Sequence, residues 1–180
     1  VPDGDTGINM LLTMRSLEEY VCELPTDTTL TAMVNAMAKG VLLGARGNSG
    51  VILSQFFRGL AAGMDGYHQC SSKELAMGFQ QAADSAYKAV AKPVEGTMLT
   101  VIRAAANAMQ VTSGKIDINT QWDAARRAAI EALARTPEQL PVLREAGVVD
   151  AGGQGVVALL EGAMAFLNGD EIQDLDITVP

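Results

Sequence analysis

Apolar residues recur along most of the chain at the spacing of helices that bury one face. Between Thr28 and Leu43, for example, the apolar positions include Leu30, Met33, Val34, Met37, Val41 and Leu42. This spacing is close to the 3.6-residue period of an α-helix. Continued along the chain, the pattern predicts seven helices, over residues 6–20, 28–43, 51–64, 72–91, 97–110, 120–146 and about 156–169.

The breaks between these segments carry recognisable signals. Ser71 and Glu74 have the spacing of a capping box, which starts a helix. Proline and glycine in the segment 92–97 end one helix and open the turn to the next. Proline is tolerated in the first turn of a helix, so we interpret Pro137 as a kink and carry the sixth helix on to Ala146. Residues 115–118 could pass for a short strand, but nothing obvious pairs with them.

Composition favours closely packed helices. Of the 180 residues, 48% are hydrophobic and only 4% are aromatic, which is typical of helices in close contact rather than of a β-sandwich. Short connections favour antiparallel neighbours. We therefore predict an all-α, up-and-down antiparallel barrel or bundle of about seven to eight helices. This domain is expected to occupy residues 1–169, with residues 170–180 a linker toward a further domain.

Charge and cysteine content exclude several classes of function. The formal net charge is −8, which is the opposite of the basic footprint of a nucleic-acid-binding protein. No apolar run reaches the ~18 residues that a membrane span needs. Cys22 and Cys70 have no metal-type spacing and fit a reducing environment. The sequence thus predicts a cytoplasmic protein without an integral membrane segment.

Four connections have unusual sequences, and each precedes an odd-numbered helix of the predicted seven. They span residues 3–7, 44–50, 93–97 and 150–155. In an up-and-down arrangement every odd helix begins at the same end, provided that Pro137 does not reverse the chain. Helix N-termini carry unpaired N–H groups and attract anions. Four of them around one opening suit a polyphosphate.

Asp3 and Asp5 supply carboxylates at the same end. Mg²⁺ is commonly held by one or two carboxylates together with substrate phosphates, and the intervening Gly4 lets both side chains turn toward one point. The alternative is an Asp-Gly turn with a helix cap, which is common. Taken with the four helix starts, the pair predicts a site for a magnesium-loaded nucleotide triphosphate.

Each of the other connections has a structural alternative. Asn48 or Ser49 could cap a helix after a flexible turn, and the segment is not a Walker A loop. Thr97 could be a plain N-cap, and Arg46 could be idle on the surface or could neutralise phosphate charge. The glycines of residues 152–155 could simply allow close helix packing. His68, the only histidine, falls at the opposite end and is expected on the surface.

The four motifs together resemble those of a known family, the nucleotide-binding domain of the dihydroxyacetone kinase L-subunit type. The similarity is closest to the N-terminal domain of bacterial fatty acid kinase A and extends over nearly the whole chain. The matching motifs are Val1-Pro2-Asp3-Gly4-Asp5-Thr6-Gly7-x-Asn9-Met10, Gly44-Ala45-Arg46-Gly47-Asn48-Ser49-Gly50, Lys92-Pro93-Val94-Glu95-Gly96-Thr97 and Val149-Asp150-Ala151-Gly152-Gly153-Gln154-Gly155.

The resemblance implies a helical barrel with ATP or ADP at one end. It implies that Asp3 and Asp5 are the metal-binding and catalytic residues, holding two Mg²⁺ ions that bridge the phosphates. In this family a further polar ligand and a helix lie upstream of the first motif, and further domains lie downstream. The nucleotide-binding residues carried over or suggested by the motifs are Thr6, Asn9, Arg46, Asn48, Ser49, Thr97, Met98, Gly152 and Gly153.

Three functions follow as alternatives. The first is transfer of the γ-phosphoryl group of ATP to a fatty acid presented by a separate fatty-acid-binding protein, giving an acyl phosphate. A fatty acid carboxylate is already ionised at neutral pH, which agrees with a site that lacks histidine. The second is a dihydroxyacetone kinase subunit, whose hydroxyl acceptor generally needs a base. The third is a non-catalytic nucleotide-binding module; homodimerisation through further domains stays open in each case.

Overall fold

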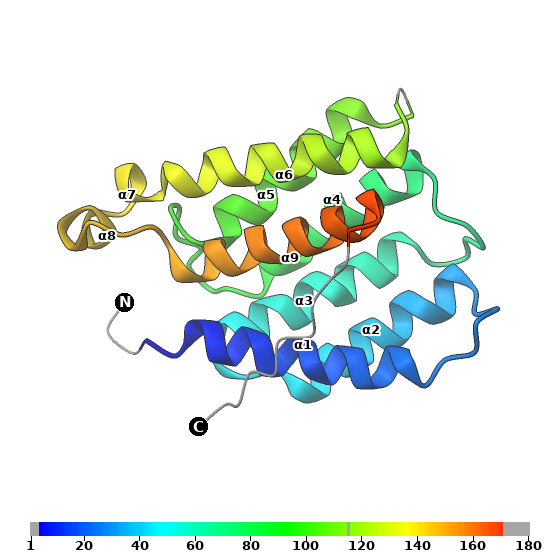
Figure 1. Cartoon of the computed structure of the whole chain (residues 1–180). Helices are drawn as coiled ribbons and strands as arrows, with labels where there is room; N and C mark the ends of the chain where they lie inside the picture. Colours follow the sequence, from blue (N-terminus) through cyan, green and yellow to red (C-terminus); the bar gives the residue numbers. More distant parts are fainter. Residues whose placement is uncertain (1–3, 115, 171–180) are drawn as a thin grey trace.

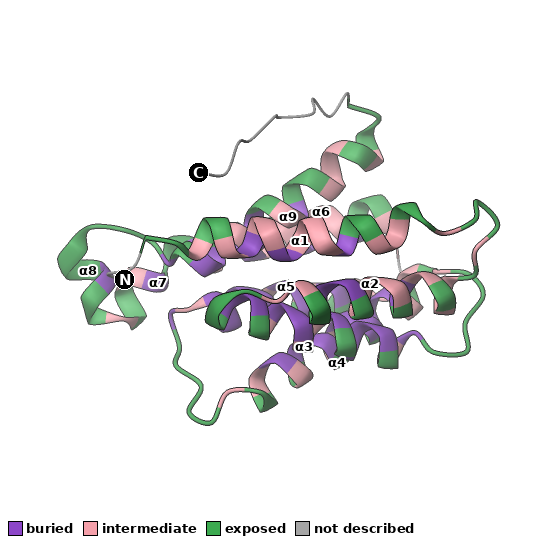
Figure 2. Cartoon of the chain, turned by 90° about the horizontal axis from the view of Figure 1, so that it is seen from below, coloured by how far each residue is buried: buried purple, intermediate pink, exposed green. Residues whose placement is uncertain are grey.

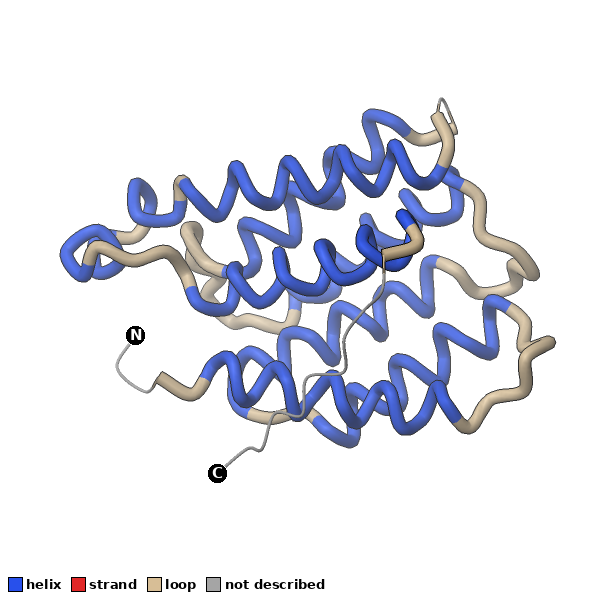
Figure 3. Tube along the Cα trace, in the orientation of Figure 1, coloured by secondary structure: helices blue, strands red, loops and turns tan. Residues whose placement is uncertain are grey.

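The computed structural model describes residues 4–114 and 116–170, and within them every regular element is a helix (Figure 3). Seven helices are long and two are short, which confirms the all-α prediction. The helices are α1 (Thr6–Cys22), α2 (Leu30–Gly44), α3 (Gly47–Gly63), α4 (Ser72–Lys88), α5 (Met98–Thr112), α6 (Ile118–Ala134), α7 (Thr136–Gln139), α8 (Pro141–Ala146) and α9 (Ala151–Asn168).

The seven long helices form a ring. Each of α1 to α6 packs against the next helix along the chain, and α9 packs against α5, α6 and, less extensively, α1 (Figure 1). The faces turned inward are buried, as the purple bands of Figure 2 show, and the most fully buried residues include Val101, Met109 and Ala125. Apolar side chains of all seven helices, among them Phe79 and Trp122, surround a cavity of about 200 Å³ inside the ring.

Helices α3 and α9 begin at least four residues earlier than the sequence pattern predicted. Helix α3 starts at Gly47 rather than Val51, and α9 starts at Ala151 although it contains three glycines in its first five residues. Close packing explains the glycines of α9, because a Cβ atom at Gly153 would lie 2.9 Å from Val101 Cγ2 and one at Gly155 would collide with the Met10 side chain. Tertiary contact here outweighs the low helix propensity of glycine.

The segment that follows α6 differs from the predicted single kinked helix over 120–146. Pro137 lies at the start of α7 and Pro141 at the start of α8, so the chain makes two short helices instead of one continuation. Leu140 takes an extended conformation (φ −122°, ψ 105°), as expected before a proline. The two short helices do not change the end at which the last long helix begins. Helix α9 starts at the same end as α1, α3 and α5, as predicted (Figure 1, left).

The structure also bears on several local predictions about helix caps, loops and the C-terminal segment. The capping box of Ser71 and Glu74 is present at the start of α4, and His68 is exposed at the opposite end of the barrel from the starts of α1, α3, α5 and α9. Residues 116–118 form no strand, because α6 begins at Ile118 with Asp117 as its N-cap. Residues 171–180, most of the predicted linker, lie outside the described residues. No helix within the described ranges is long and apolar enough to span a membrane.

Candidate functional site

A cavity of about 320 Å³ opens at the end where α1, α3, α5 and α9 begin. Four separate stretches of sequence contribute to its wall, as expected if alternate helices begin at the same end of the bundle. Six of the predicted nucleotide-binding residues line it: Thr6, Asn48, Ser49, Thr97, Met98 and Gly152. The remaining lining residues are Ile52, Val90, Lys92, Val94, Leu99, Asp150 and Ala151. The structure therefore brings the four motifs to one place.

The other predicted residues lie beside the cavity or outside the described part of the chain. Asn9 donates a hydrogen bond from Nδ2 to Asp5 Oδ2 at 2.9 Å, and a Cβ atom built on Gly47 would lie 2.7 Å from Asn9 Nδ2. The Asp5–Asn9 pair therefore sits against the start of α3. Arg46 is exposed at the same place. Asp3, the second predicted metal ligand, lies outside the described residues.

A buried threonine joins α1 to the start of α3. The Thr13 hydroxyl donates to the Asn9 carbonyl at 2.7 Å and lies 3.3 Å from the Gly44 carbonyl, and it accepts from the Arg46 N–H at 3.1 Å. Its side chain is fully buried. These bonds fix the α2–α3 connection on α1, so Thr13 positions Asn48 and Ser49 without itself reaching the cavity. Thr13 was not among the site residues predicted from the sequence.

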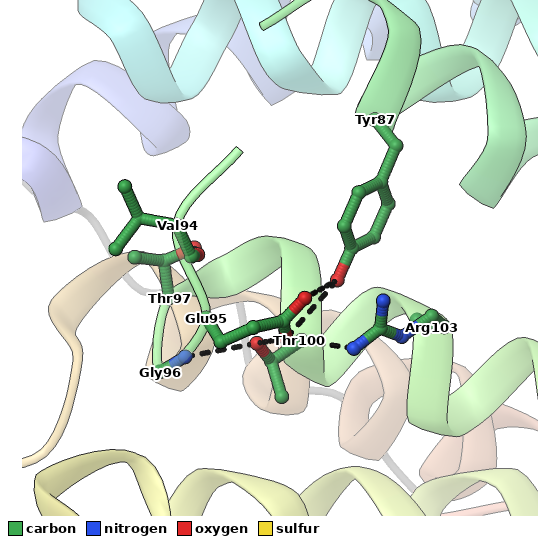
Figure 4. Close-up of polar contacts among 7 residues, drawn as sticks. All are labelled: Tyr87, Val94, Glu95, Gly96, Thr97, Thr100 and Arg103. Atoms are coloured by element: carbon green, nitrogen blue, oxygen red, sulfur yellow. Dashed lines mark hydrogen bonds and ion pairs between the residues drawn. The ribbon is translucent and has the colours of Figure 1, made fainter. Parts of the chain in front are cut away.

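The connection that leads into α5, on one side of the cavity, carries a set of hydrogen bonds centred on Glu95 (Figure 4). The Glu95 carboxylate accepts hydrogen bonds from Thr100 Oγ1 at 2.6 Å and from Arg103 at 2.7 Å. Partial burial raises the pKa of Glu95, but these bonds outweigh it and hold the pKa below its ordinary value. Thr97 is the N-cap residue of α5, as the structural alternative expected, but it makes no side-chain capping bond with any described residue; its Oγ1 donates instead to the Val94 carbonyl at 2.8 Å.

Asp150 was not predicted as a site residue, yet it lines the cavity and is 8% exposed. Its carboxylate caps α9 by accepting from the Gly153 N–H at 2.7 Å. Burial raises the pKa of Asp150, while bonds from the backbone of Gly153, Met98 and Gly152 act in the opposite direction. The backbone N–H of Asp150 donates to Thr136 Oγ1 at 3.1 Å, which ties the cap to α7.

The helix starts around the cavity consequently differ in their electrostatics. The Asp150 carboxylate already caps the start of α9 and accepts from the Gly153 N–H, so its negative charge disfavours an anion at this end. The start of α3 has no side-chain cap among the described residues, and Arg46 lies next to it. The positive end of a helix attracts anions most effectively where its N–H groups are unpaired. The α3 start is therefore the better phosphate site of the two.

Few of the described side chains at this end could serve as ligands of a metal ion. Within residues 4–114 and 116–170, no group of three or more His, Cys, Asp and Glu side chains is arranged to hold a metal. The Asp5 carboxylate is exposed and accepts a bond from Asn9, which leaves further lone pairs for a ligand. One or two carboxylates together with substrate phosphates are a sufficient ligand set for Mg²⁺, and Asp5 fits that chemistry.

Comparison with known proteins gives a consistent family match. The DAK2 domain matches residues 1–165. The chain is 47% identical to Protein YloV of Bacillus subtilis (strain 168) over 173 residues, which is 96% of this chain and 31% of that protein. It is 45% identical over 174 residues to an uncharacterized protein of Staphylococcus aureus (strain USA300), covering 96% of this chain and 32% of that protein. The chain thus spans about a third of the length of these relatives.

Proposed function

The chain belongs to the DAK2 domain family, a group of nucleotide-binding modules related to dihydroxyacetone kinase, and on that premise we propose that its terminal cavity binds Mg-ATP and donates the γ-phosphoryl group. The observation that carries the proposal is the convergence of six motif residues from four helix starts around one cavity of about 320 Å³. A cavity of this size is within the range of small-molecule sites.

The charge distribution supports one orientation of the nucleotide. The uncapped start of α3, with Asn48, Ser49 and the nearby Arg46, receives the phosphates. The opposite wall is apolar at Met98 and carries the Asp150 carboxylate, which would repel phosphate. It also holds Lys92, and the start of α5 has no side-chain cap from the described residues either, so the Asp150 charge is what distinguishes this wall from the start of α3. We therefore place the nucleobase on the side of α5 and α9 and the triphosphate between α1 and α3.

Magnesium would be held by Asp5, with Asp3 as the second carboxylate. When bound, it would supply positive charge against the β- and γ-phosphate oxygens. Thr6 and Asn9 then lie on α1 beside the phosphates, with Asn9 orienting Asp5 through the bond already described. The protein residues mainly position the groups and offset charge, as is general in phosphoryl transfer.

The acceptor that we favour is a fatty acid carried by a separate binding protein. A carboxylate oxygen would attack the γ-phosphorus, the bond from that phosphorus to the β–γ bridging oxygen would break, and ADP would leave with the electron pair. The acceptor is ionised at neutral pH because its pKa is about 4–5. No proton has to be removed, which suits a cavity whose described lining includes no histidine.

Two alternatives remain distinguishable. A dihydroxyacetone acceptor would need a base for its hydroxyl group, and among the described lining residues Asp150 is the one with a raised pKa. Its carboxylate, however, is occupied by capping α9. A non-catalytic module would bind nucleotide without turnover in any mixture. Incubating the full-length protein with [γ-³²P]ATP and purified acceptor proteins, followed by product analysis, separates the three.

Nucleotide binding is tested by titrating Mg-ADP into the full-length protein in a calorimeter. Asp5→Ala is expected to weaken binding by about tenfold or more, equivalent to about 1.4 kcal/mol. Asp27→Ala is the matched control, because Asp27 is also exposed but lies between α1 and α2 at the other end of the barrel. No binding by the parent protein would refute the proposal. Equal binding by parent and Asp5→Ala would refute the metal assignment alone.

A further inference from the structure

The Glu95 carboxylate is the centre of a polar network outside the cavity lining (Figure 4). It receives hydrogen bonds from Thr100 and Arg103 of α5, and from the Tyr87 hydroxyl of α4 at 3.3 and 3.4 Å to its two oxygens. The Arg103 guanidinium also stacks on the Tyr87 ring at 4.8 Å from its centroid. One side chain of the 89–97 connection is thus attached to both helices that the connection joins.

The same network extends to the backbone next to the cavity. Thr100 Oγ1, which donates to Glu95, accepts a bond from the Gly96 N–H at 2.9 Å. Gly96 has φ +81°, and a Cβ atom there would lie 2.9 Å from the Thr136 carbonyl. The turn at Gly96 is therefore held by Thr100 on one side and packed against α7 on the other. Thr97 and Met98, which line the cavity, follow directly in the chain.

We propose that Glu95 is a positioning residue of the nucleotide site, fixing the 92–97 turn so that Thr97 and Met98 keep their places in the cavity wall. The inference rests on the nucleotide-binding function proposed above. Glu95 itself does not line the cavity, so its effect on a bound nucleotide is indirect.

Because Glu95 is largely exposed, we expect it to affect the order of the turn more than the stability of the whole fold. The side chains of Glu95 and Arg103 are 46% and 45% exposed, and ion pairs at such positions contribute little to folding. The loss of Glu95 should hence leave the fold nearly as stable but leave the turn free to sample other conformations. Apparent affinity falls in proportion to the population of the competent conformation. A turn that is ordered about one-tenth of the time would bind about tenfold more weakly.

The experiment compares the parent, Glu95→Gln, Glu95→Ala and Glu74→Gln in the full-length protein. Glu74 is the matched control, because it also accepts bonds from a neighbouring turn but at the opposite end of α4. Mg-ADP affinity is measured by calorimetry, the unfolding temperature by calorimetric scan, and the exchange of the Gly96 amide hydrogen by NMR. Glu95→Ala is expected to weaken Mg-ADP binding by roughly tenfold, Glu95→Gln by less, and Glu74→Gln not at all.

The amide measurement decides the inference separately from the nucleotide proposal. Faster exchange at Gly96 in Glu95→Ala, with an unfolding temperature close to that of the parent, supports the ordering of the turn. Unchanged Gly96 exchange, or unchanged affinity despite faster exchange, would overturn the positioning role. If the parent binds no Mg-ADP, the nucleotide function fails and the positioning role fails with it, while the exchange result still shows whether Glu95 orders the turn.

Discussion

Replacing Thr13 by valine tests the bond that joins α1 to the start of α3. Valine keeps the branched shape and removes the hydroxyl, which leaves the Arg46 N–H without its acceptor at 3.1 Å and removes the side-chain bond to the Asn9 carbonyl at 2.7 Å. A buried polar group left unsatisfied costs about 1–3 kcal/mol. For a chain of this size that corresponds to a fall of about 2–12 °C in unfolding temperature.

Thr13→Ser is the matched control, because it keeps the hydroxyl and removes one methyl group, at a cost of about 0.8 kcal/mol. Both variants are followed by calorimetric unfolding, and Mg-ADP binding is measured on each. Valine should be the more damaging substitution for stability, and it alone should weaken binding, since it releases the segment that leads into Asn48. A serine variant as unstable as the valine variant would show that packing of the methyl group, and not the hydroxyl, holds the connection.

Three further predictions follow from packing and charge. Gly59→Ala should lower the free energy of unfolding by about 1–3 kcal/mol, because its Cβ atom would lie 2.7 Å from the Ala82 backbone. Gly162 has open space around it, so Gly162→Ala should raise the free energy of unfolding by up to about 1 kcal/mol through helix propensity. Equal effects of the two variants in urea unfolding would contradict this. Hydrogen bonds hold the pKa of Glu95 below its ordinary 4.5 despite partial burial. Its contribution to stability is small because the side chain is half-exposed; it is present above pH 4.5 and is lost as pH falls through the lowered pKa. The small difference in unfolding temperature between the parent and Glu95→Gln should therefore vanish on acidification, and a difference that grows would refute the assignment. Asp150→Ala should cost about 1 kcal/mol by removing the cap of α9, and equal thermal stability of variant and parent would show that the cap is dispensable.

The helices were predictable where an apolar face is long and regular. All seven long helices were expected, since periodic burial of one face determines them. The two short helices were not expected. Pro141 forces the preceding Leu140 out of the helical conformation, so α7 ends before it and α8 begins at the proline. The early start of α3 was missed for a different reason. Gly47, Asn48 and Ser49 are poor helix formers, and the burial of Ser49 together with the close approach of Gly50 to Thr13 of α1 outweighs that local preference.

The candidate site was predictable in outline but not in its supporting bonds. The motif positions could be grouped because alternating helix directions bring their starts together. Thr13 could have been noticed as a polar residue on the buried face between Met10 and Leu17. The partners of Glu95 lie at sequence separations set by a turn, and no helical or strand period relates them. Supporting contacts of this kind depend on the folded backbone.

The closure of the ring by α9 has a consequence for the order of folding. Helices α1 to α6 can each find a neighbour soon after synthesis, because their partners are adjacent in sequence. The contact between Met10 and Gly155 joins the first helix to the last, and contacts between residues so distant in sequence form late. The mouth between α1 and α9 is therefore completed only after the whole domain has been synthesised, and a ligand that binds there would favour the fully assembled state over partly folded ones.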